Sequence, residues 1–431
     1  MKYYSLHKKA AIVSFKEAVI KGLAEDKGLY FPETISPLDK NFINSISSYS
    51  DHEIGFEVMK QFIGNEIPES KLKQIIKDTL SFDFPLIDIE ANIKTLELFH
   101  GPTMAFKDVG ARFMARCLGY LNAHSEKEVT VLVATSGDTG GAVASGFLGV
   151  KNIKVVILYP SKKVSKVQEK QLTTLGKNIS ALEVEGTFDD CQAMVKNAFL
   201  DDSITSKKQL TSANSINVAR WLPQMIYFFI AYKQIKDKNK ELVFSVPSGN
   251  FGNICAGLLA KKLGLPIHHF IAATNVNDVV PKYLRTKLYQ AKPSMQTISN
   301  AMDVGDPSNF IRIQEIYNNE FEALKNDLHS YSFTDDATRE AMLHLFKNCN
   351  YIADPHGAVG YLGIKKYQLT HPNPQFIFIE TAHPVKFLDV VEPIINKQIE
   401  YPPQIKEVIN KTKEATIISE YSELKSFLLS N

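Results

Sequence analysis

Short runs of consecutive apolar residues alternate along the chain with segments whose apolar residues recur at helical spacing. Runs of β-branched and aromatic residues without polar alternation are typical of strands buried on both faces, whereas recurrence every three or four residues indicates amphipathic helices. The predicted strands are residues 129–135, 153–159, 179–184, 242–246, 267–273 and 376–379. The predicted helices between them include 165–175 and 189–200. This alternation predicts an α/β fold with parallel sheets and helices on both faces of each sheet.

Two glycine-rich turns follow predicted strands and open predicted helices. The first, Ser-Gly-Asp-Thr-Gly-Gly at residues 136–141, precedes a small-residue helix expected from Ala142. The second, Ser-Gly-Asn-Phe-Gly-Asn at 248–253, leads into a helix expected to run through Leu263. Ligands of parallel α/β sheets bind beyond the carboxyl ends of the strands. Both turns lie at that edge, which makes them candidates for ligand binding.

Length and charge narrow the class of protein. A chain of 431 residues is longer than one ordinary domain requires, so two or three packed domains are expected. It carries 49 basic and 47 acidic residues, and this balance gives the whole molecule no attraction for nucleic acid or an anionic membrane. Residues 1–80 mix short helical patterns with polar turns, and the alternation of strands and helices begins after them.

Cysteine and histidine usage gives no metal-binding motif. The four cysteines form no Cys-x-x-Cys pair, and the sequence lacks His-Glu-x-x-His. His268 and His269 are adjacent on a predicted strand, so they point to opposite faces and cannot share an ion. Sparse cysteines suit a reducing compartment, and we find neither a secretory signal at the N-terminus nor a membrane span in the apolar stretch 221–232. We therefore expect a cytoplasmic protein without a metal, in which residues 221–232 belong to the core.

Lys107 is the first candidate for catalysis. It lies in the segment His-Gly-Pro-Thr-Met-Ala-Phe-Lys-Asp at residues 100–108, directly after Phe106. A lysine in apolar surroundings has a lowered pKa and becomes a nucleophilic amine. The alternative is a solvated lysine at the start of a helix, and for a lysine taken at random that interpretation is the more common one.

The turn at residues 248–253 is a candidate for phosphate binding, because glycines let the backbone approach closely and N–H groups at a helix start attract anions. A simple tight turn is an equally open interpretation. The turn lacks the Gly-Lys-[Ser/Thr] ending of a nucleoside-triphosphate loop, and the chain has no Gly-x-Gly-x-x-Gly, so a single compact phosphate is favoured over ATP or NAD. The turn at 136–141 suits a carboxylate or phosphate for the same reason, with a plain turn again as the alternative. Hydrolase chemistry lacks support, since Gly-x-Ser-x-Gly is missing.

Three segments and several shorter motifs resemble one known family. H-G-P-T-M-A-F-K-D is similar to a cofactor-lysine segment, T-S-G-D-T-G to a loop for the substrate carboxylate, and P-S-G-N-F-G-N to a loop for a cofactor phosphate. Further similarity lies in V-S-F, G-L-Y-F-P, S-A-N-S-I-N, A-T-N-V-N-D, N-A-M-D and T-A-H-P. On these motifs, which span nearly the whole chain, the sequence resembles the threonine synthases of bacteria and fungi, within the fold type II pyridoxal phosphate enzymes.

The resemblance implies a fold and a cofactor. Two parallel-type α/β subdomains within residues 81–431 would enclose the active site, preceded by a small N-terminal domain at residues 1–80. Pyridoxal 5'-phosphate would form a Schiff base with Lys107. Thr381 resembles the hydroxyl partner of the pyridine nitrogen, and Asp138 would lie near the phenolic oxygen, where related enzymes often carry asparagine. The full set of implied cofactor contacts is Lys107, Asp138, Ser248, Gly249, Asn250, Phe251, Gly252, Asn253 and Thr381.

The resemblance also implies a reaction. The chain would convert O-phospho-L-homoserine and water to L-threonine and phosphate, the last step of threonine biosynthesis, as a monomer. The expected substrate-binding residues are Thr103, Ser136, Gly137, Thr139, Arg112 and Asn217. Arg220 and Arg312 are further candidates for the substrate phosphate, and no role is assigned to His383 and Lys386. A phospholyase or a dehydratase on the same scaffold, and a catalytically silent relative, stay open as alternatives.

Overall fold

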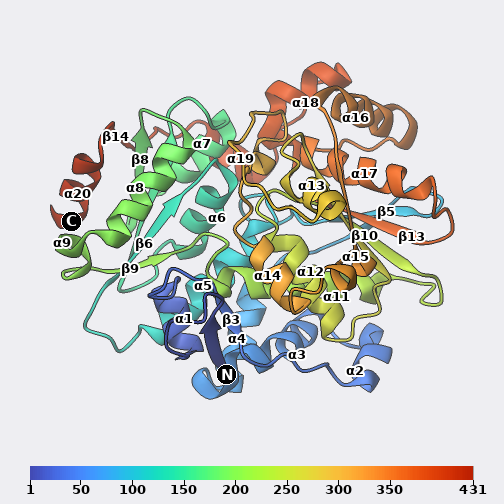
Figure 1. The fold of residues 1–431 in the computed structure, drawn as a ribbon. Helices are drawn as coiled ribbons and strands as arrows, with labels where there is room; N and C mark the ends of the chain where they lie inside the picture. Colours follow the sequence, from blue (N-terminus) through green and yellow to red (C-terminus); the bar gives the residue numbers. More distant parts are fainter. Residues whose placement is uncertain (431) are drawn as a thin grey trace.

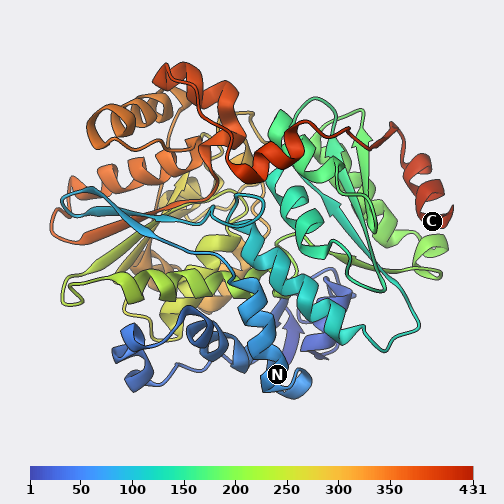
Figure 2. The same cartoon turned by 180° about the vertical axis from the view of Figure 1, so that it is seen from behind.

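Three β-sheets organise the chain in the computed structural model, which describes residues 1–430 (Figure 1). A five-stranded sheet lies at the left of Figure 1, a six-stranded sheet at the right, and a three-stranded sheet in the N-terminal part below them. Helices cover the faces of the two larger sheets (Figures 1 and 2). The predicted fold class, two parallel-type sheet domains covered by helices plus a small N-terminal domain, is confirmed.

The N-terminal part, drawn in blue in Figure 1, combines a small antiparallel sheet with short helices. Its strands are β1 (Lys2–Ser5), β2 (Val13–Ser14) and β3 (Tyr30–Pro32). Its helices are α1 (Phe15–Lys21), α2 (Lys40–Asn44), η1 (Ile46–Ser48), α3 (Asp51–Ile63), η2 (Gly64–Glu66) and α4 (Glu69–Thr79). Ser50 and Glu53 begin α3 with a capping box, since the side chain of each accepts the backbone N–H of the other.

The five-stranded sheet has the order β14-β8-β7-β6-β9, and each of its pairs is parallel. Its strands are β6 (Val129–Ala134), β7 (Ile153–Pro160), β8 (Ile179–Val184), β9 (Gln209–Ser212) and β14 (Thr416–Ile418). The helices among them are α6 (Asp138–Phe147), α7 (Lys166–Thr173), α8 (Phe188–Leu200) and α9 (Asp202–Thr205). Helix α6 begins at Asp138 and not at Ala142 as predicted. The reason is that the glycine-rich turn already forms the first turn of the helix, where Thr135 Oγ1 accepts the N–H groups of Gly137 and Gly140.

The six-stranded sheet has the order β12-β11-β10-β13-β5-β4, and only the edge pair β4–β5 is antiparallel. Its strands are β4 (Leu86–Glu90), β5 (Ile93–Glu97), β10 (Leu242–Pro247), β11 (His269–Thr274), β12 (Leu328–Ser332) and β13 (Gln375–Glu380). Its helices are α12 (Gly252–Lys262), α13 (Val279–Thr286), η4 (Asn300–Met302), α14 (Phe310–Ile316), α15 (Phe321–Asp327), α16 (Asp335–Cys349), α17 (Pro355–Gln368), η5 (Pro384–Phe387) and α18 (Leu388–Ile395). The sequence did not predict β4, β5, β9, β12 and β14, because polar residues interrupt their apolar runs.

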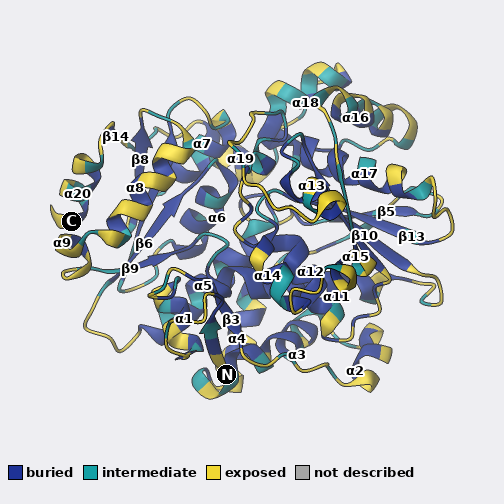
Figure 3. Ribbon diagram, viewed as in Figure 1, coloured by how far each residue is buried: buried dark blue, intermediate teal, exposed yellow. Residues whose placement is uncertain are grey.

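The core between the two larger sheets is built on four helical segments. It consists of α5 (Lys107–Leu121), α10 (Val218–Trp221), η3 (Leu222–Met225) and α11 (Ile226–Gln234). Residues 221–232 are all buried, as predicted, and the centre of the molecule is drawn dark blue in Figure 3. A helix that is apolar all round packs inside a protein and not on its surface.

The C-terminal segment joins the two larger units from behind. After α18 the chain crosses to the five-stranded sheet, where α19 (Pro403–Ile409) packs against α7, β14 pairs with β8 and α20 (Tyr421–Ser430) packs against α8 (Figure 2). A small apolar cluster of Met104, Val167, Val385, Ile405 and Ile409 forms this junction. None of the helices within residues 1–430 combines the length and the apolar character that a membrane span requires.

Gly257 on α12 offers a test of how tightly the core is packed. A Cβ atom there would lie 2.6 Å from Phe270 Cε1 and 2.7 Å from Phe228 Cζ. We expect Gly257→Ala to lower the free energy of unfolding by about 1–3 kcal/mol, the usual cost of overpacking, measured by urea denaturation. Gly119→Ala on α5 is the control, because its Cβ would meet only one side-chain methyl, that of Val150. Equal losses for the two variants would contradict the packing described.

Candidate active site

A cavity of about 640 Å³ opens between the two larger units, at the carboxyl ends of β6 and β10. One wall comes from the five-stranded side and includes Thr135, Ser136 and Thr139. The opposite wall contains the glycine-rich turn after β10 and Thr381 after β13, and Lys107 lies between the walls. The structure therefore brings both glycine-rich turns and the candidate lysine to one cavity.

Lys107 is placed by a backbone interaction between two distant segments. The Phe106 N–H donates to Thr381 O at 2.8 Å, and Met104 O accepts the N–H of His383 at 3.1 Å. Ala105 and Ala382 form an isolated antiparallel bridge between these two hydrogen bonds. Residues 104–106 are thus docked on 381–383, which puts Lys107, the first residue of α5, beside Thr381 at the cavity.

The surroundings of Lys107 favour its neutral form. Desolvation lowers the pKa of the Lys107 amine to about 8, because removal of water disfavours a charged ammonium. The Asp138 carboxylate opposes this effect, whereas the positive charges of Lys386 and Arg220 add to it. A lysine with a pKa lowered in this way has a larger neutral fraction near neutral pH, and the neutral amine is the nucleophilic form.

The turn between β10 and α12 is shaped for close approach of a ligand. Phe251 has a φ of 59°, a left-handed conformation that is uncommon for a residue other than glycine and that clusters at functional sites. A Cβ atom at Gly249 would lie 2.7 Å from both Ala301 O and Met302 Cα, so only glycine fits there. The turn leads into the N-terminus of α12, whose first N–H groups have no partner within the helix. Such a terminus suits a phosphate group.

The opposite turn presents hydroxyl groups. Ser136 and Thr139 line the cavity at the start of α6. Gly137 and Asp138 are not among the lining residues. Gly137 has a φ of 135° and packs against Gln168, and the Asp138 carboxylate forms an ion pair with Lys386 at 2.7 Å. The Asp138 carboxylate, which acts electrostatically on Lys107, is therefore paired within the protein.

Within the turn after β10, Gly249, Asn250, Phe251, Gly252 and Asn253 line the cavity. Ser248 does not, because its hydroxyl donates to Val246 O at 2.8 Å. Thr103 is also turned away, and its hydroxyl donates to Asp108 Oδ1 at 2.6 Å. These two side chains stabilise the segments that carry the cavity residues.

The structure does not bring Arg112 and Asn217 to the cavity, contrary to expectation. Arg112 lies five residues after Lys107 on α5, which turns it to another side of the helix. Its guanidinium binds the carbonyl of Asp78 and the hydroxyl of Ser81. The Asn217 side chain donates to Val19 O at 2.9 Å and caps α10. Both side chains thus have structural partners.

The Arg312 guanidinium is also bound by other parts of the protein, whereas Arg220 lines the cavity. Arg312 is buried, stacks on Trp221 and donates to the carbonyls of Tyr30, Ser215 and Ile216. Arg220 lines the cavity, and its guanidinium binds the carbonyl of Ala213. Its Nε is buried and has no hydrogen-bond partner, and no carboxylate among residues 1–430 forms an ion pair with it. Asp108 acts on the Arg220 guanidinium electrostatically, but without an ion pair in direct contact a buried guanidinium at a cavity is suited to an anionic ligand.

Sequence reasoning missed several further cavity residues. These are, among others, Asn214, Ser215, Lys292, Asn300, Asp303 and His356. His356 lines the cavity, its Nδ1 contacts Asp354 Oδ1 at 2.5 Å, and its Nε2 accepts the N–H of Ala301. The N-A-M-D motif at residues 300–303 was the available signal for this wall.

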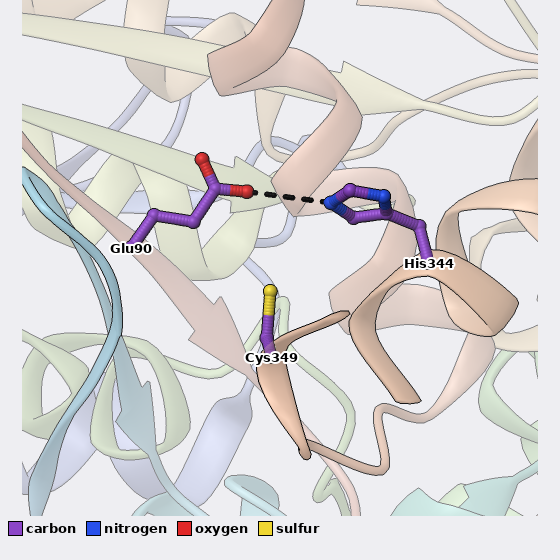
Figure 4. Close-up of side chains that lie close together, drawn as sticks. All are labelled: Glu90, His344 and Cys349. Atoms are coloured by element: carbon purple, nitrogen blue, oxygen red, sulfur yellow. Dashed lines mark ion pairs between the residues drawn. The ribbon is translucent and has the colours of Figure 1, made fainter. Parts of the chain in front are cut away.

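One group of three side chains within residues 1–430 has a composition that could bind a metal, and it lies away from the cavity. Figure 4 shows Glu90, His344 and Cys349, whose donor atoms lie within 4.8 Å of one another. Glu90 already accepts hydrogen bonds from Tyr361 at 2.5 Å and from Lys365 at 3.0 Å. The lysine charge compensates the carboxylate, so we assign the cluster to the attachment of β4 to α16 and α17.

The cavity residues fit pyridoxal phosphate. The desolvated Lys107 amine can hold an aldehyde, the glycine-rich turn leading into α12 leaves room for a phosphate, and Thr381 offers a neutral hydroxyl. A single phosphate needs no Gly-Lys-[Ser/Thr] turn, which agrees with its absence here.

Comparison with known proteins gives the same result. The chain matches family models described as "Pyridoxal-phosphate dependent enzyme" at residues 92–379, "Threonine synthase N terminus" at 2–80 and "Threonine synthase, C-terminal" at 357–428. It is 43% identical over 432 residues to threonine synthase of Buchnera aphidicola subsp. Baizongia pistaciae, with 100% of each chain covered. The crystal structure of threonine synthase from Escherichia coli superposes with a TM-score of 0.93 at 40% identity, covering 100% of each chain. The structure of PLP-bound threonine synthase from Brucella melitensis superposes with a TM-score of 0.92 at 33% identity, covering 99% of this chain and 98% of that one.

Fold and site therefore define a pyridoxal-phosphate-dependent enzyme of fold type II. Within that class, the chain belongs to the threonine synthase family, whose members are lyases.

Gly249→Ala tests the phosphate turn. The added methyl group would collide with the backbone of Ala301 and Met302 and force the two cavity segments apart. We expect the dissociation constant of pyridoxal phosphate to rise about 5- to 150-fold, the equivalent of 1–3 kcal/mol of overpacking, measured by spectroscopic titration of the apoenzyme. Gly360→Ala is the control, because its Cβ meets only ordinary contacts of 3.4 Å or more. An unchanged affinity in Gly249→Ala would show that the phosphate binds elsewhere.

Proposed function

We propose that this enzyme converts O-phospho-L-homoserine and water to L-threonine and phosphate, with Lys107 as the amine that holds pyridoxal phosphate. The observation that carries the proposal is a desolvated lysine in a cavity whose two walls are glycine-rich helix starts. Relatives that match the chain over its full length carry the name threonine synthase, which supports this reaction over others on the same fold.

The residues proposed to hold the cofactor come from three segments. Lys107 would bind it covalently, the turn from Gly249 to Asn253 would bind its phosphate, and Thr381 would contact the pyridine nitrogen. When bound, pyridoxal phosphate stabilises negative charge that develops on the substrate next to the amino group. Ser248 and Asp138 support these contacts from behind the cavity wall, since neither side chain lines it.

Lys107 is also the proposed proton carrier. A general base works best when its pKa lies near the pH of the reaction, and the pKa of Lys107 is lowered to about 8. The neutral amine can therefore remove a proton from the substrate Cα, and the ammonium can return one at the end of the reaction. The other titratable side chains that line the cavity, which include Lys292, Asp303 and His356, come from segments distant from Lys107 in sequence.

Substrate binding needs sites for a carboxylate and a phosphate. Ser136 and Thr139 at the N-terminus of α6 are suited to the carboxylate, because hydroxyl and N–H donors converge there. Arg220 is the guanidinium that we propose for the substrate phosphate, since it is buried at the cavity without a carboxylate partner. We propose Arg220 for the substrate phosphate in place of Arg112, Asn217 and Arg312, because the side chains of those three residues bind backbone carbonyls outside the cavity.

We further propose that the enzyme acts as a cytoplasmic monomer, with a first domain at residues 1–80 and a catalytic region at 81–431. The four cysteines are free, which suits a reducing compartment. Light scattering coupled to gel filtration distinguishes a monomer of 48.3 kDa from a dimer.

Product analysis tests the reaction. Incubation with O-phospho-L-homoserine and pyridoxal phosphate is expected to yield threonine and phosphate in equal amounts, and Lys107→Ala is expected to abolish turnover while the fold is kept, because no other amine occupies the position of Lys107. Chromatography of threonine and 2-oxobutanoate gives the readout. A predominance of 2-oxobutanoate would indicate a phospholyase or dehydratase, and substantial threonine formation by Lys107→Ala would refute the role of that lysine.

Arg220→Gln tests the phosphate site. Loss of a charge-assisted hydrogen bond costs about 1.5–3 kcal/mol, so kcat/KM for O-phospho-L-homoserine should fall roughly 10- to 150-fold. Affinity for pyridoxal phosphate should change much less. Arg112→Gln is the matched control, because its guanidinium binds Asp78 and Ser81 outside the cavity. A similar fall in both variants would indicate a general structural effect.

A further inference from the structure

A second lysine lies close to the proposed catalytic one and is fully buried. Lys386 is on η5, and its Nζ forms an ion pair with Asp138 Oδ1 at 2.7 Å, with side-chain exposures of 0% and 4%. The same Nζ donates to Thr103 O at 2.9 Å. A buried ion pair of this kind needs close geometry and further hydrogen bonds to offset the loss of hydration.

The Asp138 carboxylate is held from two sides. Gln168 on α7 donates to Asp138 Oδ1 at 2.9 Å, so the amide and the Lys386 ammonium bind the same oxygen. Burial by itself raises the pKa of Asp138, but Lys386 and then Lys107 lower it well below its usual range. Asp138 is therefore a permanent negative charge next to the active-site lysine.

A permanent carboxylate near Lys107 creates a competition between two lysines. The charged groups that act on Lys107 are Asp138 on α6, Lys386 on η5 and Arg220 on α10, and Asp138 has the largest influence of the three. Without Lys386, Asp138 would have only one strong cationic partner close by, the Lys107 ammonium. Opposite charges attract strongly at low effective dielectric, so such a pair would keep Lys107 protonated and turned away from a ligand.

We propose that Lys386 is a positioning residue for Lys107: it binds the Asp138 carboxylate and so prevents that carboxylate from capturing the catalytic amine. The proposal rests on Lys107 as the reactive amine of the proposed function. Lys386 does not line the cavity, and its ammonium binds the Asp138 side chain of the first glycine-rich turn and the carbonyl of Thr103.

The test measures the basicity of Lys107 in the apoenzyme and needs no turnover. The protein, prepared without pyridoxal phosphate, is labelled with limiting acetic anhydride at several pH values, and acetylation of Lys107 is quantified by mass spectrometry of its peptide. In Lys386→Met, labelling of Lys107 at pH 7 should fall roughly tenfold or more, because a nearby opposite charge raises the pKa of an amine. Lys386→Arg keeps the ion pair and should label like the unmodified protein.

A double variant separates capture by Asp138 from simple repulsion between two lysines. If Lys386 acts by holding Asp138, Lys386→Met should change Lys107 labelling very little when Asp138→Asn is already present. If Lys386 acts only through its own charge, the fall should be the same in both backgrounds, and the proposal is then wrong. Unchanged labelling in Lys386→Met alone would also overturn it.

Folding is checked for each variant by circular dichroism and urea denaturation. Should Lys386→Met not fold, because Asp138 is left unpaired, Lys386→Gln replaces it, since its amide can still donate to Asp138 while the positive charge is lost. Labelling of Lys107 at pH 7 should again fall relative to the unmodified protein, and unchanged labelling in Lys386→Gln would overturn the proposal. Lys365→Met, which removes a surface ion pair with Glu90, should leave Lys107 labelling unchanged.

The acetylation of Lys107 in the apoenzyme can be measured independently of the reaction proposed above. Threonine formation by Lys107→Ala would refute the proposed function and leave the labelling data intact. Conversely, unaltered labelling in Lys386→Met would refute the positioning role without affecting product identity.

Discussion

The backbone of residues 104–106 lies against that of residues 381–383, and the active site depends on this contact. Two hydrogen bonds and an isolated bridge join the segments, although 275 or more residues separate them in sequence. Met104 adopts a left-handed φ of 58° just before α5 begins, which orients the helix start toward the cavity. The same contact brings η5 and its lysine into place. A single strand-like junction thus sets the positions of Lys107, Thr381 and Lys386.

Charge placement around the cavity follows one physical constraint, the cost of leaving an ion unpaired in a dry environment. Asp138 is paired with Lys386, and Arg312 is solvated by backbone carbonyls. The pKa of Lys107 is instead lowered by desolvation, and Arg220 forms no ion pair with a carboxylate within residues 1–430. Lys107 and Arg220 both line the cavity, and neither side chain forms an ion pair within residues 1–430. The protein therefore places positively charged groups without a direct ion-pair partner where anionic ligands can bind.

The sequence predicted the parts of the fold that rest on local pattern. Residues 129–134, 153–160 and 179–184 are strands because their apolar runs are buried on both faces. The hairpin β4–β5 was missed, since its strands mix charged and apolar residues at the sheet edge. Arg112 and Asn217, which were expected at the substrate, do not line the cavity for another reason. Residue type suggested phosphate binding, but the direction of a side chain on its helix and the nearest free carbonyl depend on packing that no local pattern contains.

The sequence by itself determined the alternation of strands and helices, the two glycine-rich turns and the lysine after Phe106, because each arises from residue types within a few positions of one another. Only the tertiary structure decided which charged residues meet. Lys386 and Asp138 are distant in sequence and pair because the tertiary fold places η5 next to the start of α6. Arg220 and Arg312 have the same chemistry, yet one faces the cavity and the other faces carbonyls. The physical reason is that a side chain's partners are fixed by the packing of whole elements, which brings together residues that no local pattern relates.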